Sequence, residues 1–149
     1  MVSILVCSIK ASFLESLKKN ISETIGCPFE ILVWNNLTEQ KPITEVYNLL
    51  ADRAQYPYYC FIHEDIRFDT LNWAQNLLKA FEDNPKTGLI GIAGAKYKSK
   101  TPSGWSTGLA ELDRCNIRHR DKDGQVIHIY MNPNNTGFEH GEAAISTGT

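Results

Sequence analysis

The sequence lacks an excess of positive charge and lacks a long hydrophobic run. Its 149 residues carry 15 Lys and Arg against 17 Asp and Glu, a formal net charge of -2. This balance does not favour nucleic acid or an anionic membrane surface as a partner. No stretch approaches the ~20 apolar residues of a membrane span, so no transmembrane segment is expected. The opening run MVSILVCSIKAS has no basic leader, which argues against a signal peptide and favours a first core strand.

Closely spaced cysteines are also missing. The four cysteines stand far apart, at Cys7, Cys27, Cys60 and Cys115. A disulfide framework or a zinc cluster needs closer and more regular spacing. Cys7 and Cys60 lie inside apolar runs, where a thiol behaves as a small hydrophobic group. We therefore expect a reducing, cytoplasmic compartment. Peripheral attachment to the inner face of the membrane and a homo-oligomer remain open.

Several familiar active-site motifs are absent. The chain has neither the GxxxxGK run of a phosphate-binding loop nor a GxGxxG dinucleotide fingerprint, and it has no nucleophile elbow. The glycines Gly88, Gly91 and Gly94 in GLIGIAG are therefore interpreted as sites of tight turns and close packing. Phosphate binding is the alternative for these three positions.

What the chain does contain is an alternation of strand and helix patterns, long enough for one domain with a real core. The strand patterns cover residues 3–8, 29–34, 58–63 and 88–94, and the helical patterns cover residues 12–25, 43–54 and 71–83. Ser12 is the expected N-cap of the first helix, and Gly26 with Pro28 is expected to stop it. The order βαβαβαβ predicts the α/β class, with a mainly parallel sheet and helices on both faces.

Beyond Gly94 the pattern changes. The Asp-Gly pair at 123–124 lies between two possible strands and predicts a hairpin. The ending NNTGFEHGEAAISTGT has no core pattern and is expected to fray. His119 is interpreted as an exposed hairpin residue and His128 as an ordinary strand position. His140 and Glu142 could ligate a metal, but their glycine-rich context favours a solvated tail. Trp105 is expected in the core, with sugar stacking as the alternative.

Polar residues follow three of the predicted strands at their carboxyl ends. They are Ser8, then Asn35-Asn36, then His63-Glu64-Asp65. In an open parallel sheet the ligand crevice lies outside those ends. A carboxylate there can bind a divalent ion that neutralises a diphosphate, and an imidazole or amide can hydrogen-bond a nucleoside. The alternative is that Glu64 and Asp65 simply begin a solvated loop or cap the next helix.

Taken in order, the runs SILVCSIKASFLESLKKNI, FEILVWNN, ITEVYNLLADRA and YYCFIHEDIRFDTLNWAQNL resemble family 2-type glycosyltransferases of the GT-A fold. The closest likeness is to a bacterial subgroup in which His-Glu/Gln-Asp replaces the usual Asp-x-Asp. The likeness covers about residues 1–95, the nucleotide-sugar half, and leaves 96–149 as a partial acceptor-side segment of the same domain. It implies a Rossmann-like transferase that binds a nucleotide-diphosphate sugar with Mn²⁺ or Mg²⁺.

The resemblance also implies a role for individual residues. Cys7 and Ser8 stand where the first strand meets the nucleoside, and Asn35 replaces an Asp that reads the base. Tyr47 and Asn48 match a helix start beside the nucleoside. His63 takes the place that contacts ribose, and Asp65 that of the metal ligand. The expected nucleotide-sugar-binding set is Cys7, Ser8, Asn35, Asn36, Tyr47, Asn48, His63 and Glu64, with Asp65 as the metal ligand.

The catalytic base is not identified. In the family it is an Asp or Glu in the acceptor half, and Glu139 and Glu142 have no matching context. We therefore expect a truncated copy, a natural short form or a donor-binding remnant. Three functions compete. The first is sugar transfer to a hydroxyl of a surface polysaccharide or lipid-linked glycan, carried out poorly by the isolated chain. The second is a catalytically incomplete nucleotide-sugar module, and the third is an unrelated flavodoxin-like regulatory domain.

Overall fold

The computed structural model describes residues 1–97, 100, 104, 106–120 and 123–131. Its elements, in order, are β1 (Val2–Ser8), α1 (Ala11–Thr24), β2 (Phe29–Asn35), α2 (Ile43–Ala51), β3 (Tyr58–His63), α3 (Trp73–Asp83), β4 (Ala93–Ala95), β5 (Asp113–Arg120) and β6 (Val126–Met131). The chain divides into two compact units, Met1–Pro85 and Lys86–Thr149. The internal boundary expected from the sequence lay at residue 95.

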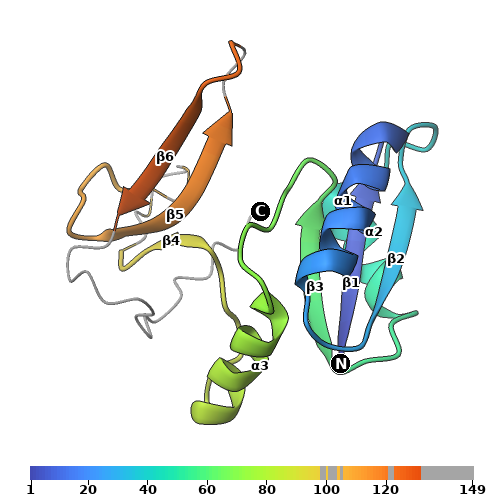
Figure 1. Cartoon of the computed structure of the whole chain (residues 1–149), viewed down its shortest axis with the longest axis horizontal. Coiled ribbons are helices and arrows are strands. Elements are labelled where there is room, and N and C mark those ends of the chain that lie inside the picture. The colour runs from blue at the N-terminus through green and yellow to red at the C-terminus, as the bar shows by residue number, and fades with distance from the viewer. Residues whose placement is uncertain (98–99, 101–103, 105, 121–122, 132–149) are drawn as a thin grey trace. The chain divides into compact units, whose positions relative to one another are not determined.

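The first unit is built on a parallel sheet with the strand order β2-β1-β3. Figure 1 shows β1 between its two neighbours. The pairing aligns Val2 with Phe29 and with Tyr58, and it continues without a bulge to the carboxyl ends of the strands. Each crossover contains one helix, as parallel neighbours require. The predicted α/β class with a parallel sheet is confirmed.

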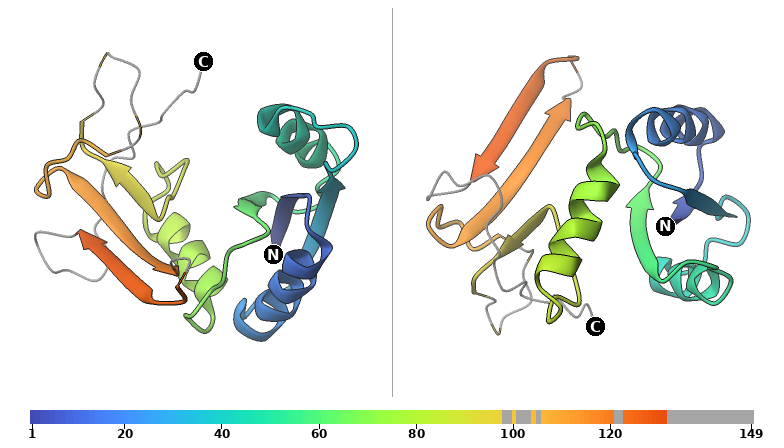
Figure 2. Two further views of the ribbon diagram at one scale, coloured as in Figure 1. Left: turned by 90° about the horizontal axis from the view of Figure 1, so that it is seen from above. Right: turned by 60° about the horizontal axis from the view of Figure 1, so that its bottom comes forward.

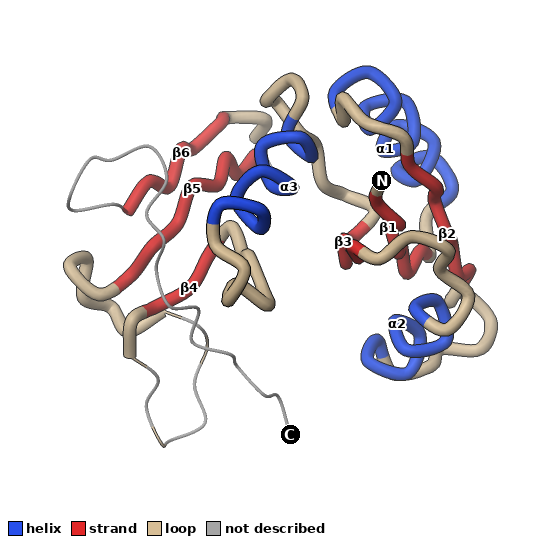
Figure 3. Tube along the Cα trace, turned by 90° about the horizontal axis from the view of Figure 1, so that it is seen from below, coloured by secondary structure: helices blue, strands red, loops and turns tan. Residues whose placement is uncertain are grey.

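Helices cover both faces of this sheet, because the side chains of β1 alternate between them. Val2, Ile4 and Val6 pack with one set of helical residues, Leu17, Ile21 and Ile25 from α1 and the turn after it, together with Trp73 and Ala74 of α3. Leu5 packs on the other face with Val46 and Leu50 of α2. Figure 3 shows α1 and α2 on opposite sides of the strands. Ile4 and Leu5 are fully buried, and each contributes about 1.5–3 kcal/mol by leaving water.

The ends of α1 differ in part from the prediction. Ser12 is not the N-cap, since the helix begins at Ala11 after Lys10, and no side chain of the cap residue bonds to the helix. The predicted stop at Gly26 is confirmed, with a backbone φ of +77° that suits glycine. A Cβ atom at Gly26 would lie 2.7 Å from the Cα of Asn72. The absence of a side chain therefore lets the start of α3 dock on the end of α1, where Asn72 N–H donates to the Thr24 carbonyl.

The second unit contains the antiparallel sheet β4-β5-β6, seen from two sides in Figure 2. The hairpin predicted at the Asp-Gly pair is confirmed, with Gly124 at a φ of +82° between β5 and β6. The backbone of His128 lies in β6, as expected, opposite Arg118. Trp105, Glu139, His140 and Glu142 lie outside the described residues.

The prediction of a fourth parallel strand over residues 88–94 is wrong. Only Ala93–Ala95 forms a strand, and it pairs antiparallel with β5. Leu89 and Ile92 are 52% and 66% exposed. The run GLIGIAG has the apolar composition of a buried strand, but composition does not specify the pairing partner, which depends on distant residues. No helix among the described residues is long and apolar enough to cross a membrane.

Candidate functional site

The three parallel strands end side by side at one edge of the first unit. Ser8 is aligned with Asn35, and Cys7 is aligned with both Trp34 and His63. Two interstrand spacings separate β2 from β3, which places the backbones of Asn35 and His63 about 10 Å apart. The predicted convergence of these strand ends is therefore confirmed.

The side chains at this edge do not all share one face. In the pleat, Cys7, Trp34 and His63 extend toward the α2 face, whereas Ser8 and Asn35 start on the α1 face. An offset of one residue reverses the direction of a strand side chain, so the side chains of Asn35 and His63 extend to opposite faces of the sheet. The Oδ1 of Asn35 accepts a hydrogen bond from the backbone of Leu37, at 3.1 Å, within its own turn.

On the α2 face, Cys7, Asn36 and Tyr47 form a connected group. The backbone of Asn36 donates to the Ser8 carbonyl at 2.7 Å, and its side-chain amide bonds both backbone groups of Lys41, which closes the loop. Burial raises the pKa of the Cys7 thiol, although a hydrogen bond with Asn36 opposes this. Cys7 is therefore a neutral thiol at neutral pH and not an activated nucleophile.

Tyr47 is the member of this group that lies on helix α2. Its hydroxyl donates to the Ile62 carbonyl at 3.0 Å, and its ring contacts Phe61 edge-on at 5.2 Å. Burial, with smaller contributions from Cys7 and Cys60, raises the pKa of Tyr47 to about 12. Tyr47 and the exposed Asn48 lie in the middle of α2 rather than at the helix start that the resemblance implied.

The residues of the His63-Glu64-Asp65 run have different surroundings. His63 and Asp65 are exposed, whereas Glu64 is only 8% exposed. The carboxylate of Glu64 accepts backbone N–H groups from Ile9 at 2.7 Å and Lys10 at 3.0 Å. Burial alone would raise the pKa of Glu64, but hydrogen bonds from Ser8, Lys10 and Ile9 outweigh it and lower the pKa. Glu64 faces the backbone before α1, which the sequence did not reveal.

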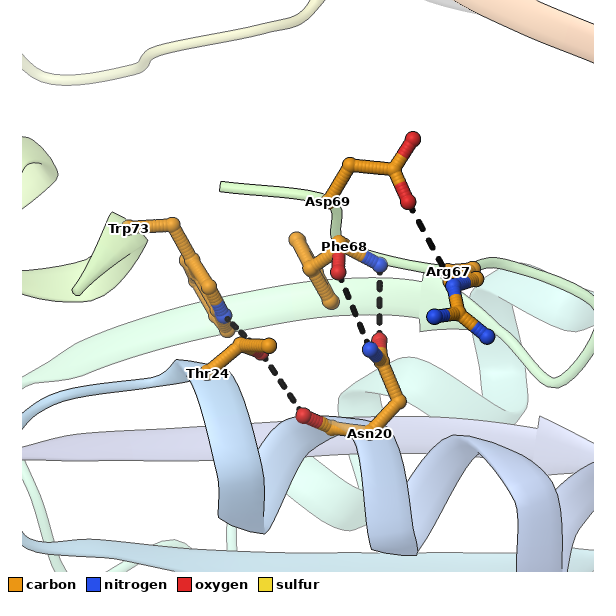
Figure 4. A network of polar contacts seen from close by, with 6 residues as sticks. All are labelled: Asn20, Thr24, Arg67, Phe68, Asp69 and Trp73. Atoms are coloured by element: carbon orange, nitrogen blue, oxygen red, sulfur yellow. Dashed lines mark hydrogen bonds and ion pairs between the residues drawn. The ribbon is translucent and has the colours of Figure 1, made fainter. Parts of the chain in front are cut away.

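The segment after Asp65 is fastened to α1 by a second group of polar residues. The Asn20 side chain donates to the Phe68 carbonyl at 2.9 Å and accepts the Phe68 N–H at 2.7 Å. Trp73, the first residue of α3, donates at 3.2 Å to the hydroxyl of Thr24, which lies farther along α1. The Trp73 ring stacks on the Phe68 ring at 4.0 Å between ring centres. Figure 4 shows this network. A groove of about 210 Å³ lies beside it, lined by Phe13, Ser16, Asn20, Glu64, Asp65, Ile66 and Arg67.

The donor atoms for a metal are few. No group of three His, Cys, Asp or Glu side chains is placed to hold a metal ion in the part of the chain that the structure describes. Mg²⁺ is commonly held by one or two carboxylates together with substrate phosphates and water. Asp65 alone at the strand end fits that sharing arrangement, in which a diphosphate completes the ligand set, and does not fit a closed protein site.

Trp34 is a residue of this edge that sequence reasoning missed. Its ring lies under two cations, with the Arg53 guanidinium at 5.5 Å and the Lys41 ammonium at 6.0 Å from the ring centre. Its indole N–H is buried and has no hydrogen-bond partner among the described residues. The signal was available in the alternation of FEILVW, which places Trp34 on the same face as Leu32.

A sequence model described as "Glycosyltransferase like family" matches residues 3–143. The chain belongs to this family. The match confirms the resemblance to family 2-type glycosyltransferases, and the mixed α/β structure is consistent with a GT-A-like nucleotide-sugar transferase fold. It runs past residue 95 into the second unit of this glycosyltransferase-like chain. No curated protein matches the sequence.

Proposed function

We propose that this glycosyltransferase-like chain binds a nucleotide-diphosphate sugar with Mn²⁺ or Mg²⁺ at the carboxyl edge of its parallel sheet. The observation that carries the proposal is the alignment of three strand ends, with Cys7 level with His63 and Ser8 level with Asn35. Such an edge is where open α/β sheets bind nucleotides. The sugar would be transferred to a hydroxyl of a glycan or lipid-linked acceptor, in the synthesis of a bacterial surface polysaccharide.

The residues at this edge would have different roles according to their positions. Cys7, Asn36 and Tyr47 form a rigid wall for the nucleoside on the α2 face, because each is held by backbone hydrogen bonds or burial. His63 lies at the end of β3 with its side chain exposed, and its imidazole would hydrogen-bond the ribose. The exposed carboxylate of Asp65 would hold the divalent cation, which when bound neutralises charge on the diphosphate leaving group.

One observation favours a second function, that of a donor-binding module without full catalytic machinery. The Glu64 carboxylate is occupied by the backbone N–H groups of Ile9 and Lys10. It is therefore unavailable as the general base that sugar transfer to a hydroxyl needs. Membership in the glycosyltransferase-like family rules out the third alternative, an unrelated flavodoxin-like domain.

Thermal unfolding of the purified chain with UDP, GDP, CDP and dTDP species, with and without Mn²⁺, tests the proposal. A ligand at a hundred times its Kd stabilises the folded state by about 2.7 kcal/mol, which raises the unfolding temperature measurably. We expect at least one nucleotide diphosphate to raise the unfolding temperature, and to do so more in Mn²⁺. If no nucleotide shifts the transition, the proposed donor site is wrong. A Mn²⁺-dependent shift without sugar transfer would identify the donor-binding module.

A further inference from the structure

The Glu64 carboxylate joins two segments that are far apart in sequence. Its Oε2 accepts the N–H of Ile9 and its Oε1 accepts the N–H of Lys10, which are 55 and 54 residues away. Each carboxylate oxygen therefore has its own backbone donor, and the hydroxyl of Ser8 adds a third hydrogen bond. Carboxylate bonds of this kind are stronger than bonds between neutral groups.

The two segments are those that meet at the proposed donor site. Ile9 and Lys10 connect the end of β1 to α1, and Glu64 directly follows His63 at the end of β3. Because β1 and β3 are neighbours, the carboxylate bridges adjacent strand ends. At the far side of the same turn, Asn20 holds both backbone groups of Phe68. The turn that follows His63 and carries Asp65 is thus fastened to the start and to the middle of α1.

We propose that Glu64 is a positioning residue of the donor site, which fixes the Ile9–Lys10 backbone against the end of β3 and does not itself contact the donor. This inference rests on the proposed function of the same strand edge. The consequence is preorganisation: the exposed side chains of His63 and Asp65 are held on a backbone that needs little ordering when a nucleotide binds. Partners that orient a ligand-binding group typically affect affinity or activity by about 10–100-fold when removed.

The chain offers a matched control at the opposite edge of the same sheet. The Oε1 of Glu30 accepts the hydroxyl of Ser3 at 2.6 Å and the N–H of Gln55 at 2.7 Å. Glu30 therefore uses a carboxylate to tie neighbouring strands in the same way as Glu64. It does so near the amino ends of β1 and β2, away from the proposed donor site.

The experiment compares Glu64→Ala, Glu64→Gln and Glu30→Gln with the wild-type chain. Calorimetry in Mn²⁺ measures the affinity for whichever of UDP, GDP, CDP and dTDP the wild type binds. The temperature is kept well below the unfolding midpoint of every variant. Amide hydrogen exchange at Ile9 and Lys10 is measured by NMR. We expect Glu64→Ala to weaken binding by at least about tenfold. Glu64→Gln should lie between it and the wild type, because the Gln amide keeps one acceptor oxygen for the two N–H groups.

Both Glu64 variants should speed the exchange of the Ile9 and Lys10 amides, while Glu30→Gln should change the nucleotide Kd by no more than roughly twofold, as expected for a distant site. Wild-type affinity in a folded Glu64 variant would overturn the inference. Weaker binding with unchanged exchange would show that Glu64 contacts the ligand. An equal loss in Glu30→Gln would show that only general stability matters. If the wild type binds none of the four nucleotides, the proposed function fails, and unchanged exchange would separately show that Glu64 does not hold the loop.

Discussion

At the scale of single residues, the neighbours Glu64 and Asp65 show how position in a turn separates two carboxylates. The first is buried and bonded to the backbone, and the second is exposed at the strand end. A buried carboxylate with three donors stabilises the local fold, whereas an exposed one is available to a cation. Both residues carry a carboxylate, and they differ in burial and in hydrogen bonding to the backbone.

We predict that Asp65→Ala removes the Mn²⁺ dependence of nucleotide-diphosphate binding and leaves the fold intact. The physical reason is that an exposed strand-end carboxylate does not support the core, and surface changes of this kind usually alter stability by about 0.5 kcal/mol or less. Calorimetry with and without Mn²⁺ measures the first effect, and thermal unfolding measures the second. A large loss of stability, or an unchanged affinity in Mn²⁺, would contradict the assignment.

A second residue-scale prediction concerns Asp113, at the start of β5. Asp113 is almost fully buried, at 1% exposure. Hydrogen bonds from Ser106, Thr107 and Gly108 lower the pKa of its carboxyl to about 2, against an ordinary value of 3.8. A depressed pKa in the folded state stabilises the protein above the ordinary value, and this contribution is lost as the pH falls from about 3.8 toward about 2. Asp113→Asn should therefore lose stability at neutral pH and show a weaker fall between those two values.

The measurement is the unfolding midpoint of the wild type and of Asp113→Asn from pH 6 to pH 2. Asp83→Asn serves as a charge-matched control, because Asp83 is an exposed carboxylate paired with Lys79 on α3. Such surface pairs contribute about 1 kcal/mol or less. If the wild type and Asp113→Asn lose stability in parallel across the acid range, Asp113 does not stabilise the loop before β5 as described.

At the scale of elements, the junction of α1 with α3 depends on one glycine. Gly26 combines a positive φ with a close approach to Asn72, and the two helices are bonded across it by Asn72 N–H to the Thr24 carbonyl at 2.6 Å. The backbone carbonyls at the end of α1 thus find donors in the next helix, as buried helix ends require. The burial of Trp73 and Ala74 at the start of α3 follows from this contact.

We predict that Gly26→Ala destabilises the first unit by more than about 1 kcal/mol, the usual cost of a side chain in this backbone conformation, because a Cβ must also displace Asn72. Gly88→Ala is the control, since a Cβ there would meet nothing within 4 Å. Denaturant unfolding followed by tryptophan fluorescence measures both variants. Equal stability of the two variants would mean that the α1–α3 junction tolerates a wider spacing.

At the scale of the whole molecule, sugar transfer requires more than the donor site. The acceptor hydroxyl must be held near the anomeric carbon, with a base within hydrogen-bond reach of its proton. The carboxylates considered for that base, Glu139 and Glu142, lie outside the described residues. The family match nevertheless runs to residue 143 and so includes both positions.

We predict that the 149-residue chain binds its donor but transfers the sugar slowly, with hydrolysis as the main reaction. Positioning and base catalysis each contribute several orders of magnitude to such reactions. The test is product analysis with and without a glycan acceptor, in the wild type, Glu139→Gln and Glu142→Gln. Robust transfer that either substitution abolishes would place the base in the tail and refute the prediction.

The sequence by itself determined the order of the elements of the first unit and the edge at which its polar residues gather. Helix and strand periods are local properties, so the runs ending at Ser8, Asn35 and His63 could be assigned from neighbouring residues alone. The hairpin at Gly124 was equally local, because an Asp-Gly pair favours the required turn.

Only the tertiary structure decided which way the side chains at that edge point and which strands pair. Because of the register of β1 with its neighbours, the side chains of Asn35 and His63 extend to opposite faces of the parallel sheet. The pairing of Ala93–Ala95 with β5 removed the expected fourth parallel strand. In the turn after β3, the Glu64 carboxylate accepts the backbone N–H groups of Ile9 and Lys10. Each of these outcomes depends on partners distant in sequence, and a local pattern contains no information on which distant group will satisfy a hydrogen bond.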